Sequence, residues 1–385
     1  MMHRVSLNET EIAVIGGGII GLSVAWQLAR AGTEVTVFER SEAGKSASWA
    51  AAGMIAPQAE VGFEELNFLK LGQESLALYP QFLAELSEDS AMTVALDTRG
   101  TLMIALDRDD REALRREFEF RKKIGLAVEW LSGSEARELE PLLSAKVTSA
   151  IWLPDDCQID NQALIVAIRE ALVRRGGKLY EQTPVERIDI EQGKVTGVVV
   201  GSGKVKAKQV VLAAGAWSRE IGGLPEAVLP AVRPVKGQIV TLKMSEPLVL
   251  TKVIRSPRVY LAPKFDGRLI VGATSEEKGF DTKPTAGGVM TLLDEAYEAV
   301  PAIYELPMEE VRVGLRPGSR DNEPLIGESA VKNLFIATGH YRHGILLAPV
   351  TAYAIAAQML GKAVSENLLP FHPTRFQKTV SHSTP

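Results

Sequence analysis

Cysteine, histidine and basic charge are all scarce in this chain of 385 residues. Its one cysteine, Cys157, excludes an intramolecular disulfide and fits a reducing compartment. With five histidines and no second cysteine, a Cys/His zinc site is not expected, and we expect no bound metal. The formal net charge of −5 argues against broad nucleic-acid binding, because that function requires a basic surface.

Long apolar runs and targeting signals are missing as well. No run reaches the roughly 18 residues of a membrane span, and the first residues are polar and lack a signal-peptide core. We therefore expect a cytoplasmic protein without a membrane span. The length allows two domains, and a hydrophobic content of 46% allows a substantial core. Because nothing resembling a linker divides the chain, we expect the two domains to be interleaved.

The clearest positive signal lies between Glu11 and Arg40, where an apolar strand, a glycine-rich turn, a helix and a second apolar strand follow one another. The turn fits G-x-G-x-x-G through Gly16, Gly18 and Gly21. In this motif the first glycine permits the tight turn, the second lets a pyrophosphate approach the backbone, and the third lets the helix pack on the strand. The free N–H groups at the start of the helix favour phosphate binding.

The second strand ends in Glu39, at about the spacing of a carboxylate that holds ribose hydroxyls. An acid here disfavours the 2′-phosphate of NADP. This stretch alone leaves NAD and FAD open, and a βαβ unit without a ligand is the alternative. The segment 44–58 follows, and its small side chains favour close contact with a ligand. The alternative for this segment is a helix start capped by Ser46 or Ser48.

Periodicity and turn signals predict the remaining elements. A capping box at Ser132 to Glu135 opens a short helix, and Asp160 is a good N-cap for the helix that follows it. Helices are expected over residues 66–86, 108–123, 161–175, 290–304 and 345–360. Strands are expected over residues 101–106, 185–190, 195–200, 204–212, 259–262, 269–273, 311–315 and 334–337.

Several motifs, taken together with the glycine-rich turn, resemble the D-amino-acid oxidase family of FAD enzymes. The resemblance covers nearly the whole chain and is strongest to the glycine-oxidising branch that serves thiamine biosynthesis. It favours FAD over NAD. The motifs are Glu39, A-A-A-G-M at Ala50–Met54, L-A-A-G-A-W-S at Leu212–Ser218, G-L-R-P-G at Gly314–Gly318 and G-H-Y-R-H-G-I-L-L-A-P at Gly339–Pro349.

The resemblance implies an α/β fold in which a Rossmann-like FAD-binding domain of the two-dinucleotide type is interleaved with an antiparallel-sheet substrate domain of α+β type. We assign residues 10–90, 150–235 and 318–372 to the FAD-binding domain, and residues 91–149 and 236–317 to the substrate domain. Residues 1–9 and 376–385 are predicted to be flexible termini.

The family also implies a reaction. A small amine loses a hydride from its α-carbon to flavin N5, the imine is hydrolysed, and dioxygen reoxidises the flavin to give hydrogen peroxide. Because the flavin supplies the chemistry, no catalytic triad or metal is required. Glycine, sarcosine and small D-amino acids all offer the same groups, so the substrate stays open. A homotetramer is implied by resemblance. A dehydrogenase that passes electrons to a quinone, and a non-catalytic dinucleotide-binding subunit, remain alternatives.

The resemblance assigns contacts with FAD to separate parts of the sequence. A helix start near Gly344 would place partial positive charge beside N1 and the C2 oxygen of reduced flavin, which are anionic. No cysteine lies near Gly314 to Arg316, where sarcosine oxidases carry their flavin, so we predict non-covalent FAD. The implied contacts are Gly16, Gly18, Ile19, Ile20 and Gly21 for the pyrophosphate, Glu39 and Arg40 for the ribose, Ala47, Ser48, Ala52, Gly53 and Met54 for the ribityl chain and flavin edge, Val185 for the adenine, Gly215 beneath the dinucleotide, and His340, Tyr341, Arg342, His343, Gly344, Ile345 and Leu346 for the isoalloxazine.

The substrate is assigned to Arg316, Arg342 and Tyr260, with Met54 beside them. A planar guanidinium can hold a carboxylate by two parallel hydrogen bonds, which makes Arg316 the first candidate. The alternatives are an ion pair of Arg316 with Asp321 or Glu323, a structural role for Arg342 in a tight loop, and a half-buried sheet aromatic at Tyr260.

Expectations for four positions, Arg258, His340, His343 and Cys157, complete the prediction. Arg258 stands where glycine-oxidising relatives can have a histidine, so the resemblance does not define the residues of the outer pocket. His340 and His343 are expected to serve loop structure or flavin contact rather than acid–base chemistry. Cys157 is expected to be a structural thiol.

Overall fold

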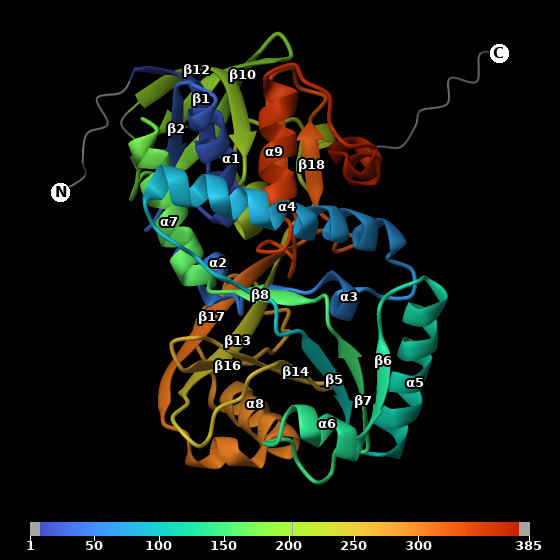
Figure 1. Cartoon of the computed structure of the whole chain (residues 1–385). Coiled ribbons are helices and arrows are strands. Elements are labelled where there is room, and N and C mark those ends of the chain that lie inside the picture. Colours follow the sequence, from blue (N-terminus) through green and yellow to red (C-terminus); the bar gives the residue numbers. More distant parts are fainter. Residues whose placement is uncertain (1–7, 202, 377–385) are drawn as a thin grey trace.

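The computed structural model describes residues 8–201 and 203–376. Figure 1 shows two layers built on separate sheets, one above the other, with the long helix α4 (Leu66–Ser90) lying between them. Most of the predicted flexible termini lies outside the described residues. Two of the residues predicted to be flexible are described and belong to regular structure: Glu9 begins strand β1, and Phe376 ends a short 3-10 helix.

The first sheet is parallel at its centre, in the order β19, β12, β1, β2, β9. Strand β18 pairs antiparallel with β19, and the hairpin β10–β11 pairs antiparallel with the first half of β12. The strands are β1 (Glu9–Ile15), β2 (Val35–Phe38), β9 (Lys178–Tyr180), β10 (Val185–Glu191), β11 (Lys194–Val200), β12 (Gly203–Leu212), β18 (Leu325–Glu328) and β19 (Leu334–Thr338).

The second half of strand β1, Ile12 to Ile15, is apolar because both of its faces are covered. Ile12 and Val14 pack into the core beneath the helices, while Ala13 and Ile15 pack into the core on the opposite side. The alternation follows from the two-residue period of a strand. The helices of the first core are α1 (Ile19–Arg30), α4, α7 (Asn161–Arg174) and α9 (Ala348–Met359).

The second sheet has the order β17, β13, β16, β15, β14, β5, β7, β6 and is antiparallel except where β14 meets β5. Helices α5 (Arg108–Lys123), α6 (Gly133–Leu139) and α8 (Ala286–Ala299) accompany it. Its strands are β5 (Thr101–Ala105), β6 (Glu129–Ser132), β7 (Ser149–Leu153), β13 (Arg233–Lys243), β14 (Val253–Arg255), β15 (Tyr260–Pro263), β16 (Arg268–Gly272) and β17 (Met308–Gly318).

A small three-stranded sheet lies where the two layers meet. Its central strand β8 (Cys157–Ile159) pairs antiparallel with β3 (Met54–Ile55) and β4 (Leu96–Asp97). Two one-turn helices, α2 (Ala47–Ala50) and α3 (Pro57–Glu60), flank β3 in the sequence. The 3-10 helices span Gly215–Glu220, Glu226–Val228, Pro301–Glu305, Glu366–Phe371 and Pro373–Phe376.

Most predicted elements are present, and three details differ. The helix expected over 290–304 is α8, which starts earlier and ends before Pro301, and the helix expected from Ile345 begins at Ala348 after a hydrogen-bonded turn. Strand β7 pairs with β5 and β6, so the predicted boundary at residue 150 falls inside a strand of the second sheet. The capping box at Ser132 and the N-cap at Asp160 are confirmed.

None of the helices in the described part of the chain combines the length and the apolar character that crossing a bilayer requires.

One buried carboxylate ties three helices together beneath the first sheet. The Asp89 side chain at the end of α4 is fully buried and accepts hydrogen bonds from Trp26 and Arg30 of α1 and from Arg175, which follows α7. Burial acts to raise the pKa of Asp89, but the hydrogen bonds from Arg175, Trp26 and Arg30 outweigh it and hold the pKa below its usual value.

We expect Asp89→Ala to lower the free energy of unfolding by about 1–3 kcal/mol, because the buried Trp26 indole loses its acceptor. A carboxylate with a lowered folded pKa stabilises the protein above its unfolded pKa of about 3.9, and this contribution is lost as the pH falls through the folded value. The difference between wild type and variant should therefore shrink in acid. Urea unfolding at several pH values measures both effects.

Glu88→Ala provides the matched control. Glu88 is the adjacent acid on the same helix and also meets Arg30, but its side chain is 65% exposed. Its loss should change the free energy of unfolding by no more than about 0.5 kcal/mol. Equal losses for the two variants would contradict the anchoring role of Asp89.

Candidate functional site

A cavity of about 480 Å³ runs between the two layers. Its walls come from the β1–α1 turn, the end of β2, the segment 46–54, the end of β12, strands β13 to β17 and the loop 337–346. All but one of the predicted site residues line this cavity. The exception is Gly21, which lies behind the turn, where a Cβ would overlap the Gly16 carbonyl oxygen. The individual roles of the predicted site residues stay predictions.

At one end of the cavity, the glycine-rich turn leaves backbone donors available. Gly16 has φ +104, and a Cβ on it would overlap the Ala213 carbonyl oxygen of the chain leaving β12. The Ile19 N–H donates to Ser48 Oγ at 3.0 Å. Within residues 8–201 and 203–376, the N–H groups of Gly18 and Ile20 meet no acceptor. Two free donors at a helix start fit a pyrophosphate.

Glu39 is buried and held by three donors. Its Oε2 accepts from Gly17 N at 2.7 Å, and its Oε1 accepts from the backbone N–H and hydroxyl of Ser41, both at 2.9 Å. A carboxylate offers about four acceptor positions, so Oε2 retains capacity for one more donor such as a ribose hydroxyl. The predicted role of Glu39 therefore fits the geometry.

Arg40 meets an aromatic pair that the sequence did not indicate. Its guanidinium lies 3.4 Å from the ring centroid of Trp217, which stacks on Phe280 at 5.5 Å. Trp217 follows β12 and also lines the cavity, so Arg40 and Trp217 together form part of the wall near Val185. A planar cation on an indole face is a favourable contact.

The middle of the cavity is formed by the segment 46–54. A helix does start here, but neither serine caps it. Ser46 makes no side-chain hydrogen bond to the one-turn helix α2, and Ser48 Oγ accepts from the Ile19 N–H instead. Gly53 has φ +74, and a Cβ there would overlap the Ile159 carbonyl oxygen. The glycine requirement at this position is thus one of both conformation and space.

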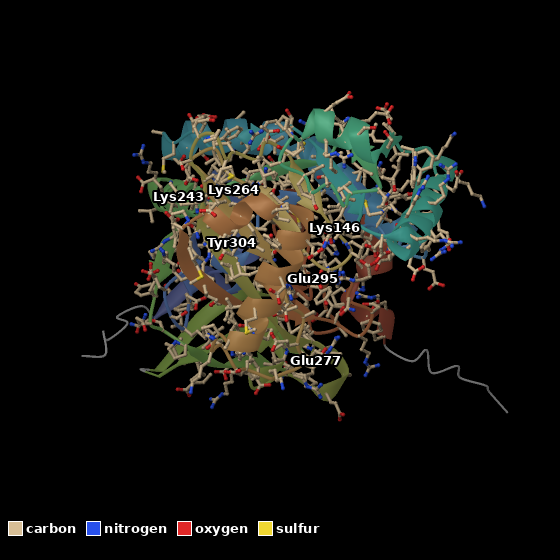
Figure 2. The ribbon with its side chains drawn as sticks, turned by 90° about the horizontal axis from the view of Figure 1, so that it is seen from below. Lys146, Lys243, Lys264, Glu277, Glu295 and Tyr304 are labelled. Atoms are coloured by element: carbon tan, nitrogen blue, oxygen red, sulfur yellow. The ribbon has the colours of Figure 1, made fainter. Side chains whose placement is uncertain are left out.

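Behind this segment lies a buried lysine that sequence reasoning missed. Lys264, labelled in Figure 2, is 7% exposed. Its ammonium donates to the Ala52 carbonyl at 2.6 Å, and to the Ile159 carbonyl and Gln158 Oε1 at 2.9 Å each. Burial lowers the pKa of Lys264 to about 7. All three donors are used, so Lys264 joins β8 and the β15–β16 hairpin to the wall at Ala52.

The loop 339–346 closes the cavity from the side of the first sheet. Burial lowers the pKa of His340 to about 3 and that of His343 to about 4, so both are neutral at pH 7. His340 Nε2 lies 3.0 Å from Thr351 Oγ1, and the His343 ring packs at a tilt against Phe68, with 4.1 Å between the ring centroids. These contacts agree with the prediction that both serve loop structure. The helix start itself lies at Ala348 rather than near Gly344.

At the other end of the cavity, Arg316 is the central charged group. Its Nη1 donates to the Thr274 carbonyl at 3.0 Å, and a Cβ on Gly237 would overlap its guanidinium. Among the described residues it forms no ion pair, and Asp321 is instead paired with Arg375 at 2.9 Å. The alternative of an Arg316–Asp321 pair is therefore wrong. The guanidinium retains donors that face the cavity.

Tyr260 lies beside Arg316 on the neighbouring part of the second sheet. A Cβ on Gly272 would overlap the Tyr260 hydroxyl, so the ring is fitted against bare backbone. Burial raises the pKa of Tyr260, more than the charge of Arg316 lowers it, so the hydroxyl stays protonated and can donate. Both side chains line the same cavity.

The outer mouth of the cavity carries a cluster of charges. Glu60, at the end of α3, is ion-paired with Arg255 and lies 3.9 Å from Arg342 Nη1. Its buried Oε2 has no hydrogen-bond partner among the described residues. Arg258 points to Glu295 of α8 at 2.6 Å. Glu60 and Arg255 belong to no motif, and only their shared surroundings identify them as part of the site.

Taken together, the cavity fits an elongated dinucleotide with an anionic centre. It offers free backbone donors at the glycine-rich turn, an acid with spare acceptor capacity at β2, and small residues along its middle. Cys157 does not line it, and burial raises the pKa of that thiol to about 11. No group of three metal-ligating side chains occurs in the described part of the chain.

Comparison with protein families supports this interpretation of the cavity. The family model for DAO, FAD-dependent oxidoreductases, matches residues 11–358. The glycine oxidase of Geobacillus kaustophilus is 36% identical over 378 residues, which cover 97% of this chain and 98% of the relative. The bifunctional protein ThiO/ThiG of Trichormus variabilis is 36% identical over 374 residues, which cover 96% of this chain and 56% of the relative.

Solved structures show the same architecture. The crystal structure of the Geobacillus kaustophilus glycine oxidase matches with a TM-score of 0.89 at 34% identity, over 96% of this chain and 99% of that one. The L-proline dehydrogenase of P. horikoshii matches with a TM-score of 0.82 at 26% identity, over 96% and 98%.

We expect Lys264→Met to remove a pH-dependent part of the stability. Because the folded pKa of about 7 lies below the unfolded pKa of about 10.4, the unfolded chain binds more protons between these values. Wild-type stability should therefore rise relative to the variant from pH 7 to pH 10, by at most about 1.4 kcal/mol per pH unit. Denaturant unfolding across this range measures the difference.

Lys243→Met is the matched control. Lys243 ends β13 at the surface, and its ammonium donates at 2.7 Å to the carbonyl of Asp266, which lies in the same β15–β16 hairpin as Lys264. Its stability should run parallel to wild type over the whole range. A Lys264→Met curve that also runs parallel to wild type would show that Lys264 is not a buried titrating group.

Proposed function

Because this chain belongs to the DAO family of FAD-dependent oxidoreductases, we propose that it is an amine oxidase acting on small α-amino acids, with glycine as the first candidate. The products would be the imine, hydrolysed to the 2-oxo acid and ammonia, and hydrogen peroxide. The observation that carries this proposal is the Arg316 guanidinium, which faces the cavity without an ion-pair partner among the described residues.

The substrate end of the cavity suits a compact amino acid. Arg316 would hold the carboxylate by two parallel hydrogen bonds, and the Tyr260 hydroxyl would donate a third. Gly237 and Gly272 make room for these two side chains, because a Cβ at either position would overlap the Arg316 guanidinium or the Tyr260 hydroxyl. This arrangement fixes the α-carbon relative to the ring of the cofactor, as positioning in an active site requires.

FAD, when bound, would supply the hydride acceptor and be reoxidised by dioxygen. The protein residues would bind and orient the amine and set its charge. Arg255 and Arg342 lie beside the Glu60 carboxylate, and Arg316 lines the same cavity without an ion-pair partner among the described residues. These positive charges would lower the pKa of a bound ammonium. The neutral amine, from which a hydride can leave, is thereby favoured without a dedicated base.

Three further assignments belong to the same proposal. Similarity to ThiO/ThiG supports a role in forming the thiazole of thiamine. The single buried cysteine is compatible with a cytoplasmic location. The family resemblance suggests a homotetramer. We propose the contacts with FAD and substrate that the same resemblance implies. Among them, Arg342 lies at the outer mouth of the cavity, beside Glu60.

An amino-acid dehydrogenase is the second candidate. The similarity to an L-proline dehydrogenase of the same fold favours it, because the same cavity then serves a reaction whose electrons go to another acceptor. The two functions share their binding residues and differ in what reoxidises the flavin.

An amine screen in air should separate these functions. We expect the purified protein to be yellow and to form hydrogen peroxide from glycine without any added acceptor. Sarcosine and small D-amino acids are tested alongside, with peroxidase-coupled detection. Turnover that appears only with an added quinone would favour the dehydrogenase, and a colourless protein inert toward every amine would exclude both.

We expect Arg316→Ala to lower kcat/KM by the equivalent of about 2–5 kcal/mol, mainly through KM, because a charged carboxylate contact is lost. Bound flavin, measured by its visible spectrum, should remain. The matched control is Arg258→Ala, which removes an arginine that lines the outer mouth of the same cavity and pairs with Glu295. It should leave KM within a few-fold of wild type. Equal kinetics for wild type and Arg316→Ala would overturn the assignment of the carboxylate site.

A further inference from the structure

We propose that Tyr79 of helix α4, supported by Ser75, is a positioning residue that aims the backbone N–H of Leu346 at the flavin and thereby sets its electron affinity. This inference rests on the proposed function. Neither residue belongs to a motif, and neither lines the cavity.

The two side chains hold carbonyl groups of this loop from behind. The Tyr79 hydroxyl donates to the Ile345 carbonyl at 2.5 Å, and Ser75 Oγ donates to the Leu346 carbonyl at 2.6 Å. Both donors are 0% exposed. Burial raises the pKa of Tyr79, so its hydroxyl is protonated and can donate at neutral pH. A buried hydrogen bond of this kind fixes the peptide that accepts it.

A fixed carbonyl also fixes the N–H group of the same peptide. In a trans peptide the C=O and the following N–H point in opposite directions. Holding the Ile345 carbonyl toward α4 therefore turns the Leu346 N–H away from α4. Leu346 lines the cavity and Tyr79 does not, so this N–H faces the cavity side.

The donors of this loop are free to meet a ligand. Among residues 8–201 and 203–376, the N–H groups of Gly344, Ile345 and Leu346 meet no acceptor, although Ile345 and Leu346 are 4% and 2% exposed. Buried N–H groups without a partner are rare in folded proteins. Their neighbours are satisfied, since Leu347 N donates to the His343 carbonyl at 2.9 Å.

These free donors suit the charge that appears on reduction. Reduced flavin is anionic at N1 and the C2 oxygen, and fixed dipoles that need no reorganisation stabilise such charge most effectively. A hydroxyl that donates to the carbonyl also polarises the peptide and strengthens its N–H as a donor. Tyr79 would thus act on the flavin through the Ile345–Leu346 peptide, without touching it. Ser75 holds the next peptide, whose Leu347 N–H is already paired with the His343 carbonyl, so it supports the loop rather than aiming a free donor.

The test is Tyr79→Phe in the FAD-loaded protein, with sulfite as the probe. Sulfite adds to N5 of oxidised flavin and leaves negative charge at N1 and the C2 oxygen, so its dissociation constant reports on the donors there. We expect sulfite to bind about tenfold more weakly and the two-electron midpoint potential to fall by about 30 mV, the equivalent for a two-electron couple. Ser75→Ala should shift both quantities in the same direction but by less, because Ser75 holds the neighbouring peptide, whose N–H is already paired.

Tyr353→Phe is the matched control. Tyr353 lies on α9, and its hydroxyl donates to Glu85 of α4 at 2.9 Å, so the same group is deleted at the same helix interface without contact to the loop. Its sulfite affinity and potential should equal those of wild type.

Two results would overturn the inference. One is a folded, yellow Tyr79→Phe protein whose sulfite affinity and potential match those of Tyr353→Phe. The other is an equal shift in both tyrosine variants, which would indicate a general loosening of the interface. A wild-type protein that binds no FAD would instead refute the proposed function, so the two failures are distinguishable.

Discussion

The structure depends on how closely three pieces of backbone approach one another at the glycine-rich turn. A Cβ on Gly21 would overlap the Gly16 carbonyl, and a Cβ on Gly16 would overlap the Ala213 carbonyl. Because these positions are glycine, helix α1 starts directly against the ends of β1 and β12. Its first N–H groups then open into the cavity, and the end of β2 delivers Glu39 to the same place.

A second close approach joins the substrate end to the loop that would meet the flavin. Strand β17 carries Arg316 in register with Val235 of β13, and its last residue, Gly318, forms a bridge with His340. Tyr341 N also donates to the Pro317 carbonyl at 3.0 Å. The guanidinium and the 339–346 loop are therefore fixed relative to each other by backbone hydrogen bonds, although they belong to different sheets.

Local patterns in the sequence predict the elements well and their limits less well. The apolar run of β1, the two strands of the β10–β11 hairpin and the caps at Ser132 and Asp160 depend only on neighbouring residues, and the structure contains them. The predicted helix start at Ile345 lies before the observed start of α9 at Ala348, because the apolar residues of the turn after His343 look like the first turn of a helix. The predicted domain boundary at residue 150 falls inside β7, which pairs with β5, because no local pattern marks where the chain passes from one sheet to the other.

The sequence by itself determined the dinucleotide-binding unit and the family, and it predicted residues at both ends of the candidate site. It could do so because glycines, an acid at a strand end and an arginine in a family motif act through their own chemistry and spacing. Only the tertiary structure decided what surrounds them. Glu60 meets Arg255, Lys264 holds the Ala52 carbonyl, and Tyr79 holds the Ile345 carbonyl across hundreds of residues of chain. Such partners have no local signature, since a buried hydrogen bond is defined by two positions that only the folded chain brings together.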